Sequence, residues 1–154
     1  LDVPDTLCSL ADMYGVPRNK INVEITESAI ISRSALRQRV ADRLVDAGFG
    51  LEIDDFGKGN SSLNTLRNIK AHTLKLDMDF LKISEDSSMR GMIIIESMIH
   101  MAKLLDMTVV AEGVETGAQR DALLEMDCDL LQGYLFSKPV PVEEFEKHVT
   151  GNLV

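Results

Sequence analysis

Four apolar runs in this chain of 154 residues each contain or precede a pair of charged side chains of the types that bind metal ions and move protons. The pairs, in chain order, are Glu24 with Glu27, Asp54 with Asp55, Lys75 with Asp77, and Glu112 with Glu115. A carboxylate within a buried strand costs on the order of several kcal/mol unless it is paired or bound to a metal ion. Each residue alone could be a solvated strand end or a helix N-cap. Because barrel enzymes place their chemistry where the carboxyl ends of parallel strands meet, the repetition predicts one oxygen-rich cluster there.

A cluster of carboxylates selects hard cations such as Mg²⁺ or Mn²⁺. Two such ions about 4 Å apart suit in-line hydrolysis of a phosphodiester. Nitrogen and sulfur ligands have little support, because the three histidines stand singly and Cys8 and Cys128 form no CxxC pair. We therefore expect an oxygen-ligand metal site, and we expect the two cysteines to be buried free thiols.

The two adjacent aspartates set a geometric condition. Neighbouring residues on a regular strand point to opposite faces, so Asp54 and Asp55 can share a site only if the strand ends or bends there. Gly57 and Gly59 follow and would supply that freedom. Lys75 points to the same face as Asp77, and its spacing leaves two roles open, an ion pair with Asp77 or a catalytic group beside the carboxylates.

Alternation of short β-branched runs with longer amphipathic stretches predicts βα units around a parallel sheet. The predicted strands are Ile21–Ile25, Leu51–Asp54, Thr73–Leu76, Thr108–Ala111 and Leu130–Leu131. The predicted helices are Pro4–Tyr14, Ser34–Ala47, Ser62–Ile69, Met89–Leu105, Ala118–Met126 and Val142–His148. The long helix is expected to bury Ile94, Ile95, Met98, Met101 and Leu105.

An eightfold βα barrel has about 250 residues, so five strands in one domain over residues 1–154 predict an incomplete barrel. We expect the missing strands to precede Leu1, in a longer parent protein. The net charge of −9 argues against a nucleic acid polymer as partner. No apolar run approaches the ~20 residues of a membrane span. The chain is expected to be cytoplasmic, although the parent could be membrane-tethered.

Five segments, taken together, resemble the EAL domain family of cyclic di-GMP phosphodiesterases. They are Val23–Ser28 (VEITES), Ile53–Leu63 (IDDFGKGNSSL), Leu74–Asp77 (LKLD), Val110–Thr116 (VAEGVET) and Gln132–Pro139 (QGYLFSKP). The resemblance covers essentially the whole chain. It implies a TIM-like (β/α) barrel of the EAL type, incomplete here because the N-terminal strands are missing.

The resemblance also implies a role for each matching residue. Glu24 and Asp54 would ligate one metal ion, and Asp54, Asp55 and Glu112 would ligate the second. Lys75 would orient the nucleophilic water together with Glu112, which would act as the general base.

Four further residues are implied in substrate binding or in support of the metal ligands. Glu27 would anchor the loop from Asp55 to Ser62, which couples the site to a dimer interface in the family. Gln132 would position the network, and Asp77 and Glu115 would support the ligands from outside.

The implied reaction opens one phosphodiester of cyclic di-GMP and yields linear pGpG, with two Mg²⁺ or Mn²⁺ ions. Ca²⁺ is expected to inhibit, because its longer bonds and looser coordination suit a tight two-metal geometry poorly. The implied partners are cyclic di-GMP, a second copy of the chain in a homodimer, and an upstream sensory or GGDEF domain.

Two departures from the family pattern matter. The chain lacks the segment with the Glu of Glu-Ala-Leu, the metal-binding Asn and a ligand-binding arginine, so we expect the isolated chain to have little or no activity. Lys58 and Asn60 replace a small residue and an aromatic one, which affects regulation or dimerisation.

Two other functions stay open. One is a degenerate EAL receptor that binds cyclic di-GMP without cleaving it. The other is a dimerisation module, in which exposed sheet edges pair with a second chain in a swapped dimer.

Overall fold

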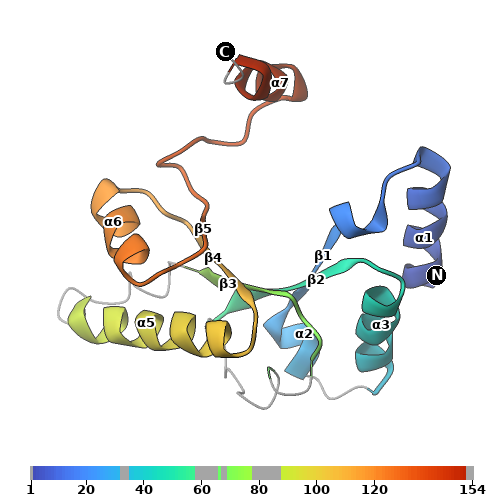
Figure 1. The fold of residues 1–154 in the computed structure, drawn as a ribbon, viewed down its shortest axis with the longest axis horizontal. Helices are drawn as coiled ribbons and strands as arrows, with labels where there is room; N and C mark the ends of the chain where they lie inside the picture. Colours follow the sequence, from blue (N-terminus) through green and yellow to red (C-terminus); the bar gives the residue numbers. More distant parts are fainter. Residues whose placement is uncertain (1, 32–34, 58–65, 67–68, 78–87, 152–154) are drawn as a thin grey trace.

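A computed structural model describes residues 2–31, 35–57, 66, 69–77 and 88–151 of the chain. Its centre is a parallel sheet of five strands in the order β1-β2-β3-β4-β5 (Figure 1). The strands are β1 (Asn22–Thr26), β2 (Gly50–Phe56), β3 (Thr73–Asp77), β4 (Thr108–Glu112) and β5 (Leu130–Leu131). Each strand pairs with the next one in the chain, as in the ring of a βα barrel. The predicted α/β fold and its five strands are confirmed.

Helices cover one face of this sheet, and α2, α3, α5 and α6 lie on that side in Figure 1. The helices are α1 (Val3–Tyr14), η1 (Arg18–Lys20, a 3₁₀ turn), α2 (Glu27–Ile31), α3 (Ala35–Asp46), α5 (Ser88–Leu104), α6 (Gly117–Glu125) and α7 (Val142–Gly151). The path from strand to helix and back positions the carboxyl end of every strand on one side of the sheet.

The main apolar core lies between the sheet and helices α5 and α6. Ile53, Leu74 and Val109 point toward the helices from three adjacent strands and are fully buried. They belong to the same cluster as Ile99 of α5 and Leu123 of α6. Each fully buried side chain of this size contributes about 2 kcal/mol through removal of apolar surface from water. The core therefore fixes the register of the strands that carry the acidic residues.

A smaller core holds β1 in place from the other end of the sheet. Ala11 of α1, Leu44 of α3 and Phe49 form this cluster. On its surface Arg43 binds Asp2 and Asp5 at the start of α1, with both N–O distances at 2.7 Å. These ion pairs are exposed, so the apolar contacts contribute most of the stability.

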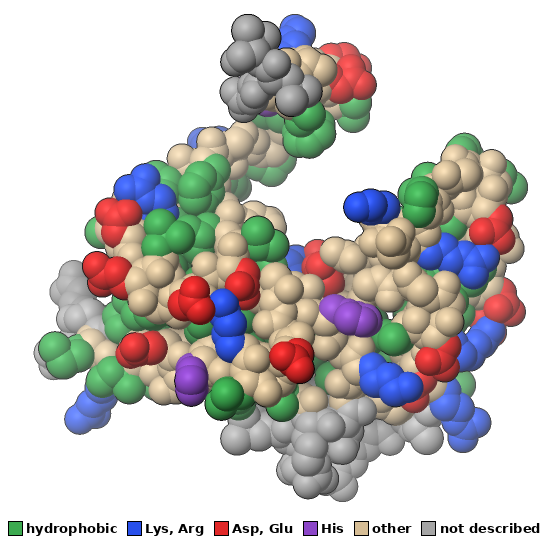
Figure 2. Space-filling view, viewed as in Figure 1, with side chains coloured by type: hydrophobic (Ala, Val, Ile, Leu, Met, Phe, Trp, Pro, Cys, Tyr) green, Lys and Arg blue, Asp and Glu red, His purple; other side chains and the backbone are tan. Residues whose placement is uncertain are grey.

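The opposite face of the sheet is mostly polar. Register pairing places Glu24 beside Glu52, Glu52 beside Thr73, and Thr73 beside Thr108 along one row across four strands. Leu130 on β5 is apolar and 55% exposed. In a closed barrel this face is the inner wall, and we use that name for it here. It borders the open space between helix α7 and helix α1 (Figure 2).

The sheet is open at both sides within the described part of the chain, since β1 pairs only with β2 and β5 only with β4. The chain after β5 runs away from the sheet to α7, which stands apart from the other helices (Figure 1). The structure is thus a portion of a barrel, as the sequence predicted.

Two helix predictions need correction. The five-residue α2 was not predicted, because Glu27–Ile31 is too short for a periodic pattern to emerge. In α5, Ile94 is 42% exposed, whereas Ile95 is buried.

Leu105, also predicted to be buried, is 47% exposed, while Ile99 and Ala102 face the core instead. Met98 and Met101 pack against the core as expected. The predicted helix Ser62–Ile69 lies largely outside the described residues, although Leu66 is helical and buried.

Both cysteines are free thiols, as predicted, and Cys128 is buried. The prediction that Cys8 is also buried is wrong, because it is only half-buried. Burial raises the pKa of the Cys128 thiol, which keeps it protonated. None of the described helices is both long enough and apolar enough to cross a lipid bilayer.

Candidate functional site

A β-bulge in β2 brings Asp54 and Asp55 to the same end of the sheet. Ile53 pairs with Leu74, and the next pair is Phe56 with Leu76, so two aspartates on β2 face the single residue Lys75 on β3. Such a two-for-one pairing bends the strand and turns its side chains. It also returns Phe56 to the helix-covered face, where it is 1% exposed in the main core.

The backbone of Asp55 itself makes this bend. Asp55 has a φ of 56°, in the left-handed region that Asp and Asn tolerate better than most residues with a Cβ. Its N–H donates to the Asp54 carboxylate at 2.9 Å. The predicted bend is therefore present, but it begins at Asp55, one residue inside the strand end, before the glycines. Gly57 then continues it with a φ of 102°.

Lys75 is the centre of the charged cluster. It lies on β3 and is 7% exposed, and its ammonium donates to Glu24 Oε1 on β1 at 2.6 Å. Glu112 Oε1 on β4 lies 2.9 Å from Lys75 Nζ, and Asp54 Oδ1 on β2 lies 3.7 Å from it. Carboxylates from three other strands of the sheet, β1, β2 and β4, thus lie around one cation.

The electrostatics of the cluster keep Lys75 charged. Burial acts to lower the pKa of Lys75, but the hydrogen bonds to Glu24 and Glu112 and the charge of Asp54 outweigh it and hold the pKa above its usual value. A lysine in this state cannot accept a proton near neutral pH. It can donate hydrogen bonds and offset negative charge, which are the roles left to it in any reaction at this site.

Glu27 links helix α2 to the bulged strand. Its side chain is 2% exposed, and its Oε2 accepts the Gly57 N–H at 3.3 Å, directly after the bulge. The sequence prediction places the anchored loop at residues 55–62. Residues 58–65, with Lys58 and Asn60, lie outside the described residues, so only the first contact of that loop is seen.

The remaining predicted residues lie around the same edge. Asp77 ends β3 and pairs in register with Glu112. Glu115 is exposed in the turn before α6, where its N–H donates to Gln119 Oε1. Gln132 follows β5, and its backbone bonds Ala111 and Val114 on the β4 side.

One acidic residue on the inner wall escaped the sequence prediction. Glu52 lies two residues before Asp54 on the same face of β2, and its Oε1 accepts from Asn22 Nδ2 at 2.7 Å. The period of two along a strand, counted back from Asp54, would have found it. It adds a further carboxylate one layer below the cluster.

The donor chemistry of the cluster fits a divalent cation. Glu24, Asp54 and Glu112 offer carboxylate oxygens around one position, which is the ligand type that Mg²⁺ and Mn²⁺ prefer. In this structure the Lys75 ammonium forms ion pairs with these oxygens. Within the residues that the structure describes, no group of three or more His, Cys, Asp or Glu is already arranged to hold a metal ion.

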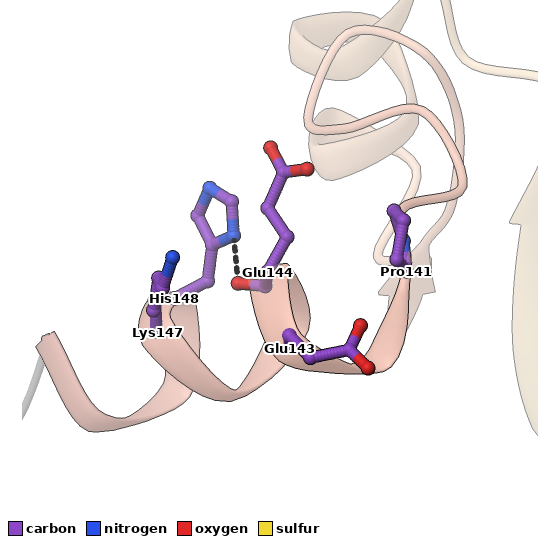
Figure 3. Close-up of a pocket in the computed structure, with 5 residues that line it drawn as sticks. All are labelled: Pro141, Glu143, Glu144, Lys147 and His148. Carbon is purple, nitrogen blue, oxygen red and sulfur yellow. Dashed lines mark hydrogen bonds between the residues drawn. The ribbon is translucent and has the colours of Figure 1, made fainter.

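A hollow on α7 lies apart from this cluster. Pro141, Glu143, Glu144, Lys147 and His148 line it, and Figure 3 shows Glu144 and His148 on the same side of the helix. His148 Nδ1 lies 2.9 Å from the Glu144 backbone oxygen, a contact within the helix. All five side chains are substantially exposed or at the surface of the arm, and none is a predicted site residue.

Comparison with known proteins identifies the family pattern. The family model described as EAL domain matches residues 2–139. The chain is 34% identical over 148 residues to the cyclic di-GMP phosphodiesterase RocR of Pseudomonas aeruginosa, an alignment covering 96% of this chain and 38% of RocR. It is 37% identical over 147 residues to the signaling protein YkoW of Bacillus subtilis, covering 96% of this chain and 18% of YkoW. The chain therefore spans well under half of the length of either relative.

Solved structures show the same fold. The cyclic di-GMP complex of the MucR phosphodiesterase matches with a TM-score of 0.82 and 30% identity, over 92% of this chain and 57% of that one. Klebsiella pneumoniae BlrP1 with manganese and cyclic di-GMP matches with a TM-score of 0.79 and 31% identity, over 88% of this chain and 34% of that one. BlrP1 is also known as a calcium and cyclic di-GMP complex, with a TM-score of 0.80 to this chain.

Proposed function

Because the chain belongs to the EAL domain family, we propose that it supplies the carboxylate-rich side of a two-metal site that hydrolyses cyclic di-GMP to linear pGpG. RocR is named as a cyclic di-GMP phosphodiesterase, and the MucR phosphodiesterase is known in complex with cyclic di-GMP. Both are similar to this chain over more than nine-tenths of its length. The proposal extends that activity to a protein that contains this chain together with the rest of an EAL domain.

The convergence of Glu24, Asp54 and Glu112 on Lys75 Nζ carries this proposal. These carboxylates come from β1, β2 and β4 and lie 2.6, 3.7 and 2.9 Å from one cationic atom. Asp54 and Glu112 are largely buried, whereas Glu24 is half exposed, and buried negative charge destabilises a fold unless a cation offsets it. One lysine carries a single positive charge, so three carboxylates around Lys75 leave a surplus of negative charge that supports a site for further cations.

We assign the metal ligands from this arrangement. Glu24 and Asp54 would hold one Mg²⁺ or Mn²⁺ ion, and Asp54, Asp55 and Glu112 would hold the second. The bulge supports this assignment, because it brings two adjacent aspartates to the end of one strand. Bound in this way, the ions would lower the pKa of a coordinated water and offset charge on the phosphate.

The protein's own groups would guide the proton and the substrate. Glu112 is positioned to accept the proton of the attacking water, and Lys75, which stays charged, would donate a hydrogen bond to that water. Gln132, Asp77 and Glu115 would position these groups or the substrate from the strand ends.

Three regulatory features accompany the proposal. Ca²⁺ should inhibit, because its longer and more flexible bonds fit poorly in a site built for a smaller ion. Glu27 would couple the Gly57 backbone to a homodimer interface. A sensory or GGDEF domain would provide the input, in line with the similar protein MucR, which is named as a bifunctional diguanylate cyclase and cyclic di-GMP phosphodiesterase.

The test compares this chain alone with a chimera in which the upstream segment of the MucR phosphodiesterase domain is joined before Leu1. Both are incubated with cyclic di-GMP and Mn²⁺, and pGpG release is followed by chromatography. We expect no turnover by the chain alone, because it spans only 57% of the MucR chain. We expect turnover by the chimera, and loss of about 10²-fold or more when Glu112 is replaced by alanine.

The chimera also separates the competing functions. Binding of cyclic di-GMP without release of pGpG would support the degenerate receptor and contradict the phosphodiesterase. Turnover that survives both Glu112→Ala and Asp54→Asn would contradict the assignment of the site. Replacing Mn²⁺ with Ca²⁺ should stop turnover while binding persists.

A further inference from the structure

Lys75 occupies the position where the carboxylates of the cluster meet. Its Nζ donates to Glu24 at 2.6 Å and lies 2.9 Å from Glu112 and 3.7 Å from Asp54. Glu24 belongs to the first proposed metal position and Glu112 to the second, and Asp54 is shared between the two. The lysine therefore bridges the ligands of two sites from the middle of the sheet.

An ammonium group and a metal ion make the same demand on a carboxylate. Each takes up an oxygen lone pair, and a lone pair that accepts a hydrogen bond from Lys75 is not free to coordinate a cation. The two positive charges would also repel each other within a few ångströms, more strongly at a site that water only partly reaches. Glu112 and Asp54 are 19% and 22% exposed in their side chains, so screening by water is limited there.

We propose that Lys75 is a built-in counter-cation that competes with divalent ions for Glu24, Asp54 and Glu112, so that loading of the cluster moves its Nζ away from Glu24. This inference rests on the two-metal function proposed above. It adds an order of events to that function, because the lysine becomes available to the reacting water only after a metal ion has taken its carboxylates.

The alternative explanation of the Lys75 cluster is an ion pair that only stabilises the fold. The chain contains a comparable ion pair of that kind. Lys103 on α5 bridges Asp127 and Asp129 at 3.0 and 2.8 Å, just as Lys75 bridges its carboxylates. That pair joins α5 to the segment before β5 and lies at the surface, where its lysine is 30% exposed. If Lys75 were of this kind, removing either lysine would affect metal binding equally little.

The experiment titrates Mn²⁺ into the full chain and measures free Mn²⁺ by electron paramagnetic resonance. Four forms are compared: the natural chain, Lys75→Met, the matched control Lys103→Met, and Asp54→Asn. We expect Lys75→Met to bind the first Mn²⁺ about tenfold more tightly, because one competing positive charge has been removed next to the ligands. Lys103→Met should bind as the natural chain does, and Asp54→Asn should bind more weakly.

A second measurement needs no substitution and covers the case in which Lys75→Met fails to fold. Lysine side chains of the natural chain are labelled with an acylating reagent, and the labelled positions are quantified by mass spectrometry with and without Mn²⁺. Displacement of Lys75 from Glu24 and Glu112 should raise its labelling rate several-fold, while Lys103 stays unchanged.

The outcomes separate the two proposals. Equal or weaker Mn²⁺ binding by Lys75→Met, or a labelling rate of Lys75 that Mn²⁺ leaves unchanged, would overturn the competition while the metal site stands. Tighter binding by Lys103→Met to the same extent would also overturn it, since the effect would then be one of overall charge. If Mn²⁺ binds the natural chain and Asp54→Asn alike, the proposed metal site itself is wrong.

Discussion

The β-bulge at Asp55 leads to a quantitative prediction about stability. Asp55 has a φ of 56°, a conformation that costs a residue with a Cβ about 1–2 kcal/mol and that short polar side chains partly offset by local hydrogen bonding. Asp55→Asn keeps such a side chain and should leave the free energy of unfolding nearly unchanged. Asp55→Val has a β-branched side chain, which is a strong outlier at positive φ, and should lower it by about 2 kcal/mol.

For a chain of this length, a loss of about 2 kcal/mol corresponds to a fall in Tm of about 4–8 °C. Unfolding in urea would be followed by far-UV circular dichroism, since the chain has no Trp for fluorescence. EDTA is present throughout, so that loss of a metal ligand does not enter the result. Asp106 is the matched control, because it has the same φ of 56° in the turn between α5 and β4, outside the bulge.

Asp106→Val should therefore cost about as much as Asp55→Val, and both asparagine variants should be close to neutral. If Asp55→Val were as stable as Asp55→Asn while Asp106→Val lost about 2 kcal/mol, residue 55 would not be held at positive φ. The two-for-one pairing with Lys75, and the route by which both aspartates reach one site, would then be wrong.

Two other expectations concern the loops around β5. Gly133 packs against the Val114 backbone so closely that an added Cβ would overlap it, so Gly133→Ala should lower the free energy of unfolding by about 1–3 kcal/mol. Gly117→Ala should not, because an added Cβ there would meet only the Arg120 side chain at 3.9 Å, and equal Tm values for the two variants would contradict the close packing of Gly133. Burial raises the pKa of Asp129, but the hydrogen bonds from Lys103 and from the Val109 N–H lower it by more. The pKa of Asp129 in the folded protein therefore lies below its unfolded value. The contribution of ionised Asp129 to the free energy of unfolding is therefore present above about pH 4 and is lost as the pH falls through the folded pKa. Asp129→Asn should flatten the decline in stability between about pH 5 and pH 3, as measured by urea unfolding at each pH. A parallel decline in the natural chain and the variant would refute this prediction.

The sequence was sufficient to predict the strands, because their apolar runs are short, β-branched and bounded by turn residues. It could not fix the rotation of α5, where Ile93, Ile94 and Ile95 stand in succession and any of them could face the core. In the structure, Ile95 and Ile99 pack in the core against the sheet, and Ile93 and Ile94 are exposed. A local pattern cannot contain that choice, since it depends on the shape of the surface opposite the helix.

For the candidate site, the sequence predicted where the acidic residues lie better than it predicted which residues contact one another. Strand ends that share one edge were enough to bring Glu24, Asp54 and Glu112 together. The partners of Lys75 across neighbouring strands depend on register, which follows from the packing of the whole sheet. The bulge escaped prediction because a period of two says only that the strand must bend, and glycine is the usual residue at a bend.

The polar inner wall of the sheet has a consequence for how such a barrel can be divided. Both apolar cores lie on the outside of the sheet, between the strands and helices α1, α3, α5 and α6. A division between β2 and β3 would split the main core, because Ile53 and Leu74 belong to one cluster, whereas the outer edges of β1 and β5 carry main-chain groups that no described strand pairs with. Further strands can therefore be joined at these two edges without disturbing the core, as the chimera requires.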